Sequence, residues 1–236
     1  MERKTIMKIG FIGAGKVGSA FAKYLKHCNQ EVTGFYSKSS ESMIKAGEFV
    51  GGIQGFTLSG LVEASELIFI TTNDDQIGVM AEEIVGLQLD LKAKKFCHMS
   101  GAHSIEILRP LEEVGGKCYS LHPLQAFANS QEALEKLADT VFSFETIKDN
   151  EEMLSLLKAM GNRYFTIESK DKSLYHMAAC IISNYLVTVL DQGFKVLQAI
   201  GVNEDIAIEA FLPLINGTID NIAKLGTEQA LTGPIA

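Results

Sequence analysis

The chain has 236 residues, 47% of them hydrophobic and 21% charged, and its formal net charge is −8 at pH 7. This length and composition are typical of a soluble globular protein with one large domain, or with one large and one small domain. An acidic chain whose Lys and Arg residues are scattered excludes a nucleic-acid-binding surface, which requires a basic patch.

The first apolar run, Met7–Ile12, leads through a glycine-rich turn into a helical pattern. In a turn of the form G-x-G-x-x-G, the first glycine permits a tight bend, the second lets the backbone approach a pyrophosphate, and the third allows close packing of helix on strand. The free amides at the start of such a helix favour an anion. The context predicts a dinucleotide-binding βαβ unit, and the alternative is a tight turn without a ligand. The turn residues expected to contact the cofactor are Gly13, Ala14, Gly15, Lys16, Val17 and Gly18.

The second strand, Glu31–Tyr36, ends about 20 residues beyond the glycines, where proteins that bind NAD usually carry an acidic residue. Here Ser37, Lys38 and Ser39 follow instead, and their hydroxyl and ammonium groups can hold a 2′-phosphate through charge-assisted hydrogen bonds. The sequence therefore predicts NADP(H) as the cofactor. In the alternative, Lys38 is a solvated loop residue and Ser39 or Ser40 only caps the next helix.

Later apolar runs continue the alternation of strands and helices. Strands are predicted at Leu67–Thr72, Lys95–Met99 and Lys117–Leu121, with a helix at Ile105–Val114 before the last of them. This pattern is typical of an α/β fold with a doubly wound, mostly parallel sheet. The elements expected at one edge of that sheet, where some strands can be antiparallel, are the strand Val141–Glu145, the helix Glu151–Met160 and the strand Tyr164–Ile167.

Beyond Glu168 the strand pattern stops and a long helix is predicted over Asp171–Ile200, with Gly201 ending it and Asn203 capping another. We therefore expect a dinucleotide-binding domain over residues 1–168 and a smaller all-α domain over residues 169–236. The long helix contains too many polar residues for a membrane span. An apolar helix of this length needs a packing partner, so we expect the second domain to form a homodimer.

Four polar residues are candidates for the active site. In an open parallel sheet, ligands bind beyond the carboxyl ends of the strands, and Ser100 and His122 follow two predicted strands there. His176 and Asn184 lie on the long apolar helix, where polar groups need partners. Imidazole titrates close to neutral pH, so His176 first and His122 second are the candidate proton donors, with Ser100 and Asn184 orienting the substrate. The alternative is that these side chains only satisfy backbone groups.

The remaining histidines and the cysteines predict no further chemistry. His98, His103 and His122 lack a Cys or carboxylate that would complete a metal-ligand spacing, so we expect no metal site. The four cysteines form no C-x-x-C pair and are typical of thiols in a reducing cytosol. The chain begins without the apolar core of a signal peptide, so we expect a cytoplasmic protein.

Several motifs carry a resemblance to a known family over essentially the whole chain. They are Gly13-x-Gly15-x-x-Gly18, Met99-Ser100-Gly101-Ala102, Ser120-Leu121-His122-Pro123-Leu124-Gln125-x-Phe127, Tyr175-His176-x-Ala178-Ala179, Ser183-Asn184-Tyr185 and Leu231-Thr232-Gly233-Pro234. The chain resembles NADP-oxidoreductase-like proteins in which a Rossmann-like domain precedes a helical domain of unknown function. That family is related to pyrroline-5-carboxylate reductase and to 6-phosphogluconate dehydrogenase-like enzymes.

The resemblance implies hydride chemistry with NADP(H). It also implies that Thr72 and Asn73 lie beside the cofactor ribose, although relatives tend to carry Val-Pro at these positions. Without the proline, this loop is less rigid. The last motif continues further in the family, which implies that this sequence is cut short.

We therefore expect an NADP(H)-dependent oxidoreductase that transfers a hydride to or from a small carbonyl or imine substrate. Only Arg109 and Arg163 occur beyond the N-terminal segment, which disfavours a phosphorylated substrate held by an arginine clamp. One alternative is a non-catalytic NADP-binding redox sensor or assembly protein. Another is an NAD-dependent dehydrogenase in which Lys38 has no role.

Overall fold

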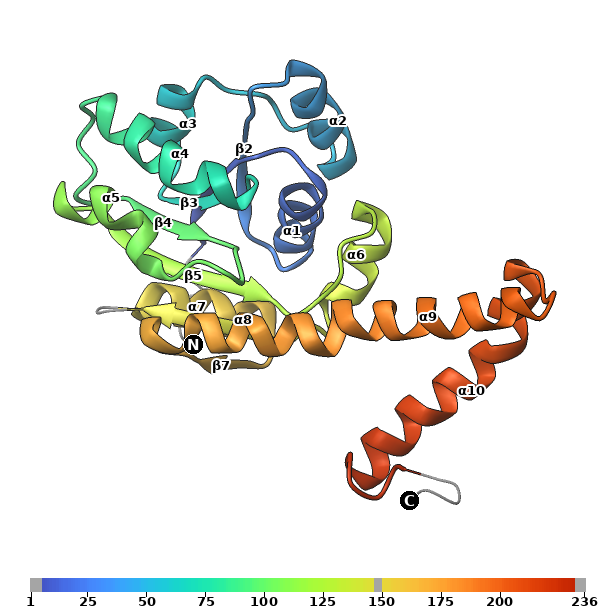
Figure 1. Ribbon diagram of the computed structural model, residues 1–236. Coiled ribbons are helices and arrows are strands. Elements are labelled where there is room, and N and C mark those ends of the chain that lie inside the picture. Colours follow the sequence, from blue (N-terminus) through green and yellow to red (C-terminus); the bar gives the residue numbers. More distant parts are fainter. Residues whose placement is uncertain (1–5, 147–149, 232–236) are drawn as a thin grey trace. The chain divides into compact units, whose positions relative to one another are not determined.

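Seven strands form one sheet in the order β2-β1-β3-β4-β5-β6-β7 (Figure 1). The computed structural model describes residues 6–146 and 150–231. Strands β1 to β5 are parallel, β6 runs antiparallel to β5, and β7 runs parallel to β6. The predicted doubly wound, mostly parallel sheet is confirmed. The strands are β1 (Lys8–Ile12), β2 (Glu31–Tyr36), β3 (Leu67–Ile70), β4 (Lys95–His98), β5 (Lys117–Pro123), β6 (Phe142–Thr146) and β7 (Tyr164–Thr166).

Helices cover both faces of this sheet and enclose two apolar cores. Phe11 and Phe69 stack on one face with ring centroids 5.5 Å apart, and buried residues of four helices join them. Those helices are α1 (Lys16–His27), α2 (Ser40–Val50), α6 (Ser130–Leu137) and α7 (Glu151–Met160). The core of the other face contains Ile68 and Ile70. It is covered by α3 (Leu58–Ala64), α4 (Asp74–Gly86), the 3₁₀ turn Ile105–Leu108 and α5 (Arg109–Glu113).

Strand β5 is longer than the sequence predicted, and this moves one candidate residue. His122 lies within β5 and not in a loop after it. The strand continues because β6 pairs with it in antiparallel register, with His122 opposite Ser143 and Pro123 opposite Phe142. The placement of His122 after a strand ending at Leu121 was therefore wrong. The side chain of His122 consequently alternates with its strand neighbours and faces the same side of the sheet as Ser120.

The chain divides into two compact units, Met1–Met177 and Ala178–Ala236. The last strand of the described residues ends at Thr166, and only helices follow, as the composition predicted. Helix α8 (Lys172–Cys180) follows the 3₁₀ turn Ser169–Asp171 and contains the boundary between the units. The domain division between residues 168 and 169 stays a prediction.

The second unit contains the rest of the helical region. The π-helical segment Ile181–Tyr185 joins α8 to α9 (Leu186–Ala199), so the predicted long helix is interrupted by a π turn. Gly201 has φ +87°, and Asn203 accepts a 2.9 Å hydrogen bond from the amide of Asp205 at the start of α10 (Glu204–Leu225). The expected stop and cap are confirmed.

In the part of the chain that the structure describes, two helical segments, Ser169–Ala199 and Glu204–Leu225, are long and apolar enough to cross a membrane by length and composition. The same composition occurs in soluble proteins, where such helices pack in a core or an interface. Lys172 of the first segment is buried by β5 and β6 and bonded to their side chains, which lipid does not offer. The absence of a membrane span stays a prediction.

Candidate cofactor and active site

The glycine-rich turn between β1 and α1 has a backbone conformation and a tight packing that require glycine at two positions. Gly13 has φ +107°, and a Cβ atom there would lie 2.7 Å from the backbone carbon of Thr71. The Thr71 hydroxyl donates a 2.9 Å hydrogen bond to the carbonyl oxygen of Gly13. A Cβ atom on Gly18 would meet that same carbonyl oxygen and the Thr71 hydroxyl. Gly13 and Gly18 are therefore required for the close approach of β1, α1 and the end of β3.

Gly15 is glycine for a different reason. Apart from Gly15 and its two chain neighbours, no heavy atom lies within 4 Å of the position that its Cβ would occupy, so the protein leaves this space open. Gly15 is the N-cap of α1, no side chain caps this end, and no acidic residue lies in the first turn. An uncapped helix N-terminus beside a residue without a side chain fits a pyrophosphate, which accepts hydrogen bonds from the free amides.

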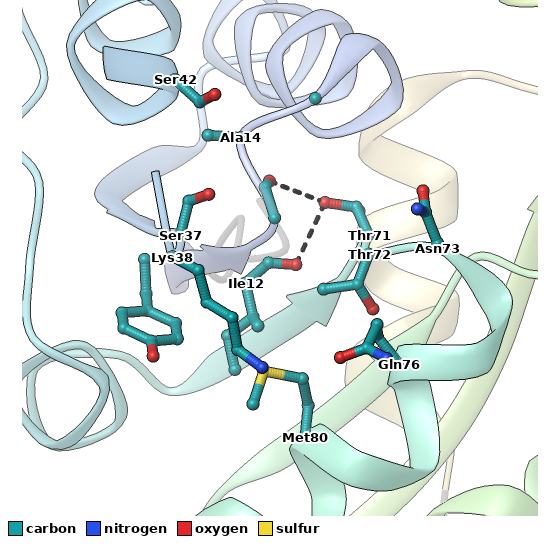
Figure 2. A pocket seen from close by; sticks show the side chains of 13 residues that line it. Ile12, Ala14, Ser37, Lys38, Ser42, Thr71, Thr72, Asn73, Gln76 and Met80 are labelled. Carbon is teal, nitrogen blue, oxygen red and sulfur yellow. Dashed lines mark hydrogen bonds between the residues drawn. The ribbon is translucent and has the colours of Figure 1, made fainter. Parts of the chain in front are cut away.

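A cleft of about 400 Å³ opens at the carboxyl ends of β1, β2 and β3 (Figure 2). Its lining brings together seven residues that the sequence predicted, namely Gly13, Ala14, Gly15, Ser37, Lys38, Thr72 and Asn73. Six further lining residues had no predicted role in cofactor binding, namely Ile12, Tyr36, Ser42, Thr71, Gln76 and Met80. Thr71 follows β3 directly, and the rule that ligands collect beyond parallel strands predicts its segment at this edge.

Four predicted cofactor residues, Lys16, Val17, Gly18 and Ser39, do not line this cleft. The Ser39 side chain accepts a hydrogen bond from the amide of Ser42 at the start of α2. The capping role considered as an alternative is therefore the one that the structure gives to Ser39.

Lys38 extends from the end of β2 to the cleft, where its ammonium group lies 3.7 Å from the carboxylate of Glu83 on α4. Both side chains are exposed to a substantial degree, at 65% and 39%, so this ion pair is weak. A 2′-phosphate at Lys38 would have to compete with Glu83 for the same ammonium group.

Replacing Glu83 with Gln is therefore expected to tighten NADPH binding by about two- to fivefold, the value of one exposed ion pair. NADH, which lacks the phosphate, should bind equally well to both proteins. Glu82→Gln, which removes the neighbouring exposed carboxylate of α4, is the control. Fluorescence titration at fixed salt measures these affinities, and equal tightening for NADH would contradict the assignment of Lys38.

Replacing Gly15 with Ala tests the open space at the start of α1. The backbone of Gly15, with φ −84°, accepts any residue, so the variant should fold, with at most the small loss of stability that alanine causes at an N-cap. Its methyl group fills the space proposed for the pyrophosphate, and NADPH affinity should fall by about tenfold or more. Gly86→Ala, at another glycine with no atom within 4 Å of its Cβ position, should leave affinity unchanged. Unaltered affinity in Gly15→Ala would place the cofactor elsewhere.

Ser100 follows β4 and is buried. Its hydroxyl oxygen accepts hydrogen bonds from the amides of Ala102 (3.1 Å) and His103 (3.2 Å). Its own amide donates a 3.2 Å hydrogen bond to Nδ1 of His98. The Ser100 side chain thus stabilises the loop after β4, and only its hydroxyl hydrogen remains for a ligand.

His122 is half-buried, and its Nδ1 lies 2.6 Å from the hydroxyl oxygen of Tyr175 on α8. Burial and, to a smaller extent, the interactions with Lys172 and His176 together lower the pKa of His122 to about 4. The carboxylate of Asp74, next to the cleft residue Asn73, acts in the opposite direction. His122 is therefore neutral at physiological pH and is a poor acid when it acts alone.

Lys172 of the first unit carries its charge in an almost fully buried position. Its side chain is 2% exposed, and its ammonium group donates a 2.9 Å hydrogen bond to the Ser120 hydroxyl. The equally buried carboxylate of Glu145 lies 3.6 Å away. Burial lowers the pKa of Lys172, and the attraction of Glu145 opposes this shift. Glu145 also accepts hydrogen bonds from the Ile105 amide (3.0 Å) and the Ser169 hydroxyl (2.6 Å).

The other two candidate residues lie on the helical part of the chain. His176 follows Tyr175 on α8 and contributes to the lowered pKa of His122. Its role as a proton donor stays a prediction. Asn184 belongs to the second unit, where it is exposed in the π-helical segment Ile181–Tyr185. Its role in orienting a substrate stays a prediction.

Sequence analysis missed the buried polar residues next to His122. His98 at the end of β4 and the polar residues that alternate with apolar ones in the second half of β5 and in β6 share one face of the sheet. These five residues, which we call the polar face, are His98, Ser120, His122, Ser143 and Glu145. Alternation of polar and apolar residues in a strand usually marks a sheet face that is exposed to solvent. The contacts of Lys172 and Tyr175 with Ser120 and His122 show that α8 covers the polar face instead.

The comparisons with known proteins agree with this architecture. Residues 2–123 match the Rossmann-like domain family, and residues 140–236 match a domain of unknown function called DUF2520. No protein in a search of curated sequences matches this chain.

Many solved structures share the fold, and three of them illustrate the range. A Thermotoga maritima protein is 26% identical, with a TM-score of 0.74, and the match covers 96% of this chain and 83% of that one. The pyrroline carboxylate reductase of Plasmodium falciparum with NADP bound is 17% identical, with a TM-score of 0.68 and coverage of 98% and 86%. An NADH-preferring ketol-acid reductoisomerase from an uncultured archean is 18% identical, with a TM-score of 0.77 and coverage of 97% and 73%.

The glycine-rich turn, the mostly parallel sheet and the cleft at its carboxyl edge all lie within or beside the matched residues. At these identities the solved structures establish the fold. Since residues 2–123 make up more than half of the chain, the protein belongs to the Rossmann-like domain family, with a DUF2520 region after that domain.

Proposed function

We propose that the protein binds NADP(H) in the cleft at the carboxyl ends of β1, β2 and β3 and reduces a small carbonyl or imine substrate. The observation that carries the cofactor assignment is the composition of the cleft. Its wall combines the open helix N-terminus at Gly15 with Ser37 and Lys38, and none of its thirteen described lining residues is acidic. Such a wall favours a ligand with several phosphates, including one at the ribose 2′ position.

The related structures support the reaction class without deciding the cofactor. Among them are a reductase with NADP bound and a reductoisomerase that prefers NADH, so the fold accommodates either nicotinamide cofactor. The preference for NADP(H) in this chain rests on Lys38 and on the missing acidic residue at the end of β2.

The roles of the chain's own residues follow from their positions. Bound NADPH would supply a hydride, and reduction of a C=O or C=N bond also requires a proton on the oxygen or nitrogen. His176 is the first candidate to deliver that proton, because His122 is neutral at physiological pH and carries no extra proton to give. The Ser100 hydroxyl hydrogen and Asn184 are the proposed hydrogen-bond donors to the substrate.

The experiment that tests this function follows NADPH oxidation at 340 nm with a panel of small ketones and cyclic imines, including cyclohexanone and 1-pyrroline. Substrate-dependent oxidation that is slower with NADH supports the proposal. Tight NADPH binding without any turnover would instead favour a non-catalytic redox sensor. One observation favours that second candidate, since the oxygen of Ser100 is already bonded to two backbone amides.

We also propose that the helical region forms a homodimer. Large apolar side chains of α9 and α10 are exposed, among them Val189 at 67% and Leu214 at 64%. A cleft of about 500 Å³ between these two helices is lined by apolar residues and Thr218. Exposed apolar area of this kind marks an interaction surface. Asp191, Lys195 and Asp220 on the same helices favour a protein partner over lipid.

Light scattering of the purified protein without detergent is expected to give twice the mass of one chain, because a second copy would cover this apolar surface. A monomeric mass, or recovery of the protein only with detergent, would contradict the proposed dimer. A dimeric protein that remains soluble without detergent would also support the expected dimerisation role of residues 169–236.

A further inference from the structure

The polar face of the sheet is a buried layer of hydrogen-bonding groups beneath α8. His98, Ser120 and Ser143 have no exposed area, and Glu145 is 2% exposed. Burial of so many polar groups is costly unless each has a partner. Lys172 and Tyr175, one turn apart on α8, supply partners by bonding to Ser120 and His122. The arrangement therefore fixes α8 against the ends of β4, β5 and β6.

The ring of His122 has a defined orientation within this layer. Its Nδ1 edge faces the hydroxyl of Tyr175 at 2.6 Å. Its opposite edge lies over Gly101, where a Cβ atom would come within 2.8 Å of both Nε2 and Cε1. Gly101 follows Ser100 in the loop after β4, so the absence of a side chain there leaves room for the ring. The Nε2 edge thus points to the loop at the carboxyl edge of the sheet.

The charged groups around His122 mainly disfavour protonation of its ring to the cationic form. Lys172 and His176 on α8 disfavour a cationic ring, and the carboxylate of Asp74 on α4 favours it. A neutral imidazole has one donor and one acceptor nitrogen. A tyrosine hydroxyl that donates to Nδ1 leaves the hydrogen on Nε2.

We propose that Tyr175 and Lys172 are positioning residues that hold His122 as a neutral ring with its hydrogen on Nε2, and that this N–H group binds the oxygen or nitrogen atom of the substrate. The inference rests on the proposed reductase function and assigns different roles to the two histidines. His176 transfers the proton to the substrate, whereas His122 keeps its proton and stabilises the charge that develops on the same atom as the hydride arrives. A neutral imidazole in a fixed orientation suits this second role.

Substitution at position 122 separates the two roles. Glutamine has an N–H group near the position of Nε2 but cannot transfer a proton at neutral pH, and leucine offers neither. In NADPH oxidation with a substrate from the panel, His122→Gln should stay within about tenfold of the wild type, and His122→Leu should lose about 10²- to 10³-fold. A loss in His122→Gln as large as that in His122→Leu would overturn the hydrogen-bonding role, because it would show that His122 transfers the proton.

Nitrogen NMR of ¹⁵N-histidine-labelled full-length protein tests the positioning roles without a substrate. His122 should carry its hydrogen on Nε2 from pH 6 to pH 8, and Tyr175→Phe should give a mixture of tautomers. Lys172→Met should raise the titration midpoint of His122 by about one pH unit or more. The control is Lys170→Met, which removes an exposed charge two residues away. If Lys172→Met does not fold, the variant with both Lys172→Met and Glu145→Gln replaces it, because it leaves no unpaired buried charge.

A hydrogen on Nδ1 of His122, a cationic ring at neutral pH, or equal midpoints in the Lys170 and Lys172 variants would overturn the positioning roles. These outcomes are distinct from failure of the proposed function. Absence of NADPH binding, or of turnover with every substrate in the panel, would contradict the reductase and leave the NMR result to decide the state of His122.

Discussion

Replacement of Lys172 by methionine should lower the free energy of unfolding by about 3–5 kcal/mol, because it leaves the Glu145 carboxylate buried without its cation. Replacing both residues, with Lys172→Met and Glu145→Gln, should recover most of this loss, since neither buried charge then remains. Denaturant unfolding followed by circular dichroism measures both values.

The control for this prediction is Lys170→Met, which breaks a fully exposed ion pair with Glu168 and should leave the free energy of unfolding unchanged. Lys172 and Lys170 are separated by one residue, and each variant removes one positive charge. The comparison therefore separates the effect of losing a buried charge from the effect of losing an exposed one. Equal stability of all three variants would mean that water reaches Lys172 in solution and that the buried pair does not exist there.

Replacement of His176 by glutamine should reduce turnover by about 10²- to 10⁴-fold while leaving the dissociation constant for NADPH unchanged. The reason is that glutamine preserves the size and a hydrogen-bonding group but cannot deliver a proton. Steady-state NADPH oxidation gives the turnover, and nicotinamide fluorescence gives the affinity. His27→Gln, at an exposed histidine near the end of α1, is the control.

Unchanged turnover in His176→Gln would remove His176 from the mechanism. If His122→Gln then showed the large loss, the order of the two proton donors assigned here would be reversed. If NADPH affinity fell in proportion to turnover, His176 would act in cofactor binding.

Much of the fold could be predicted because local patterns and tertiary structure agree in the first unit. The apolar runs at β1, β2 and β3 and the glycines between β1 and α1 have one consistent interpretation as a βαβ unit. The helix Ser130–Leu137 was not predicted, since only Ala133 and Leu137 of its eight residues are buried and its apolar pattern is faint. The extension of β5 to Pro123 depends on pairing with β6, which no local pattern specifies.

The candidate site was predicted less completely, for a physical reason. The positions of Gly13, Gly15 and Lys38 follow from local backbone geometry and strand order, and these residues do line one cleft. The contacts of Lys172 with Ser120 and Glu145 join residues far apart in the sequence, and spacing carries no information about them. A buried lysine has no sequence signature, because lysine on a helix is normally a solvated residue.

The most direct test of the central claim is a parallel titration of the wild-type protein with NADPH and NADH, followed by nicotinamide fluorescence at fixed salt. Tighter binding of NADPH, with the preference lost in Lys38→Ala, is the result expected if the cleft at the ends of β1, β2 and β3 holds NADP(H) with its 2′-phosphate at Lys38. Binding of neither cofactor would contradict the assignment of the cleft, and equal binding of both in the wild type would contradict the role of Lys38.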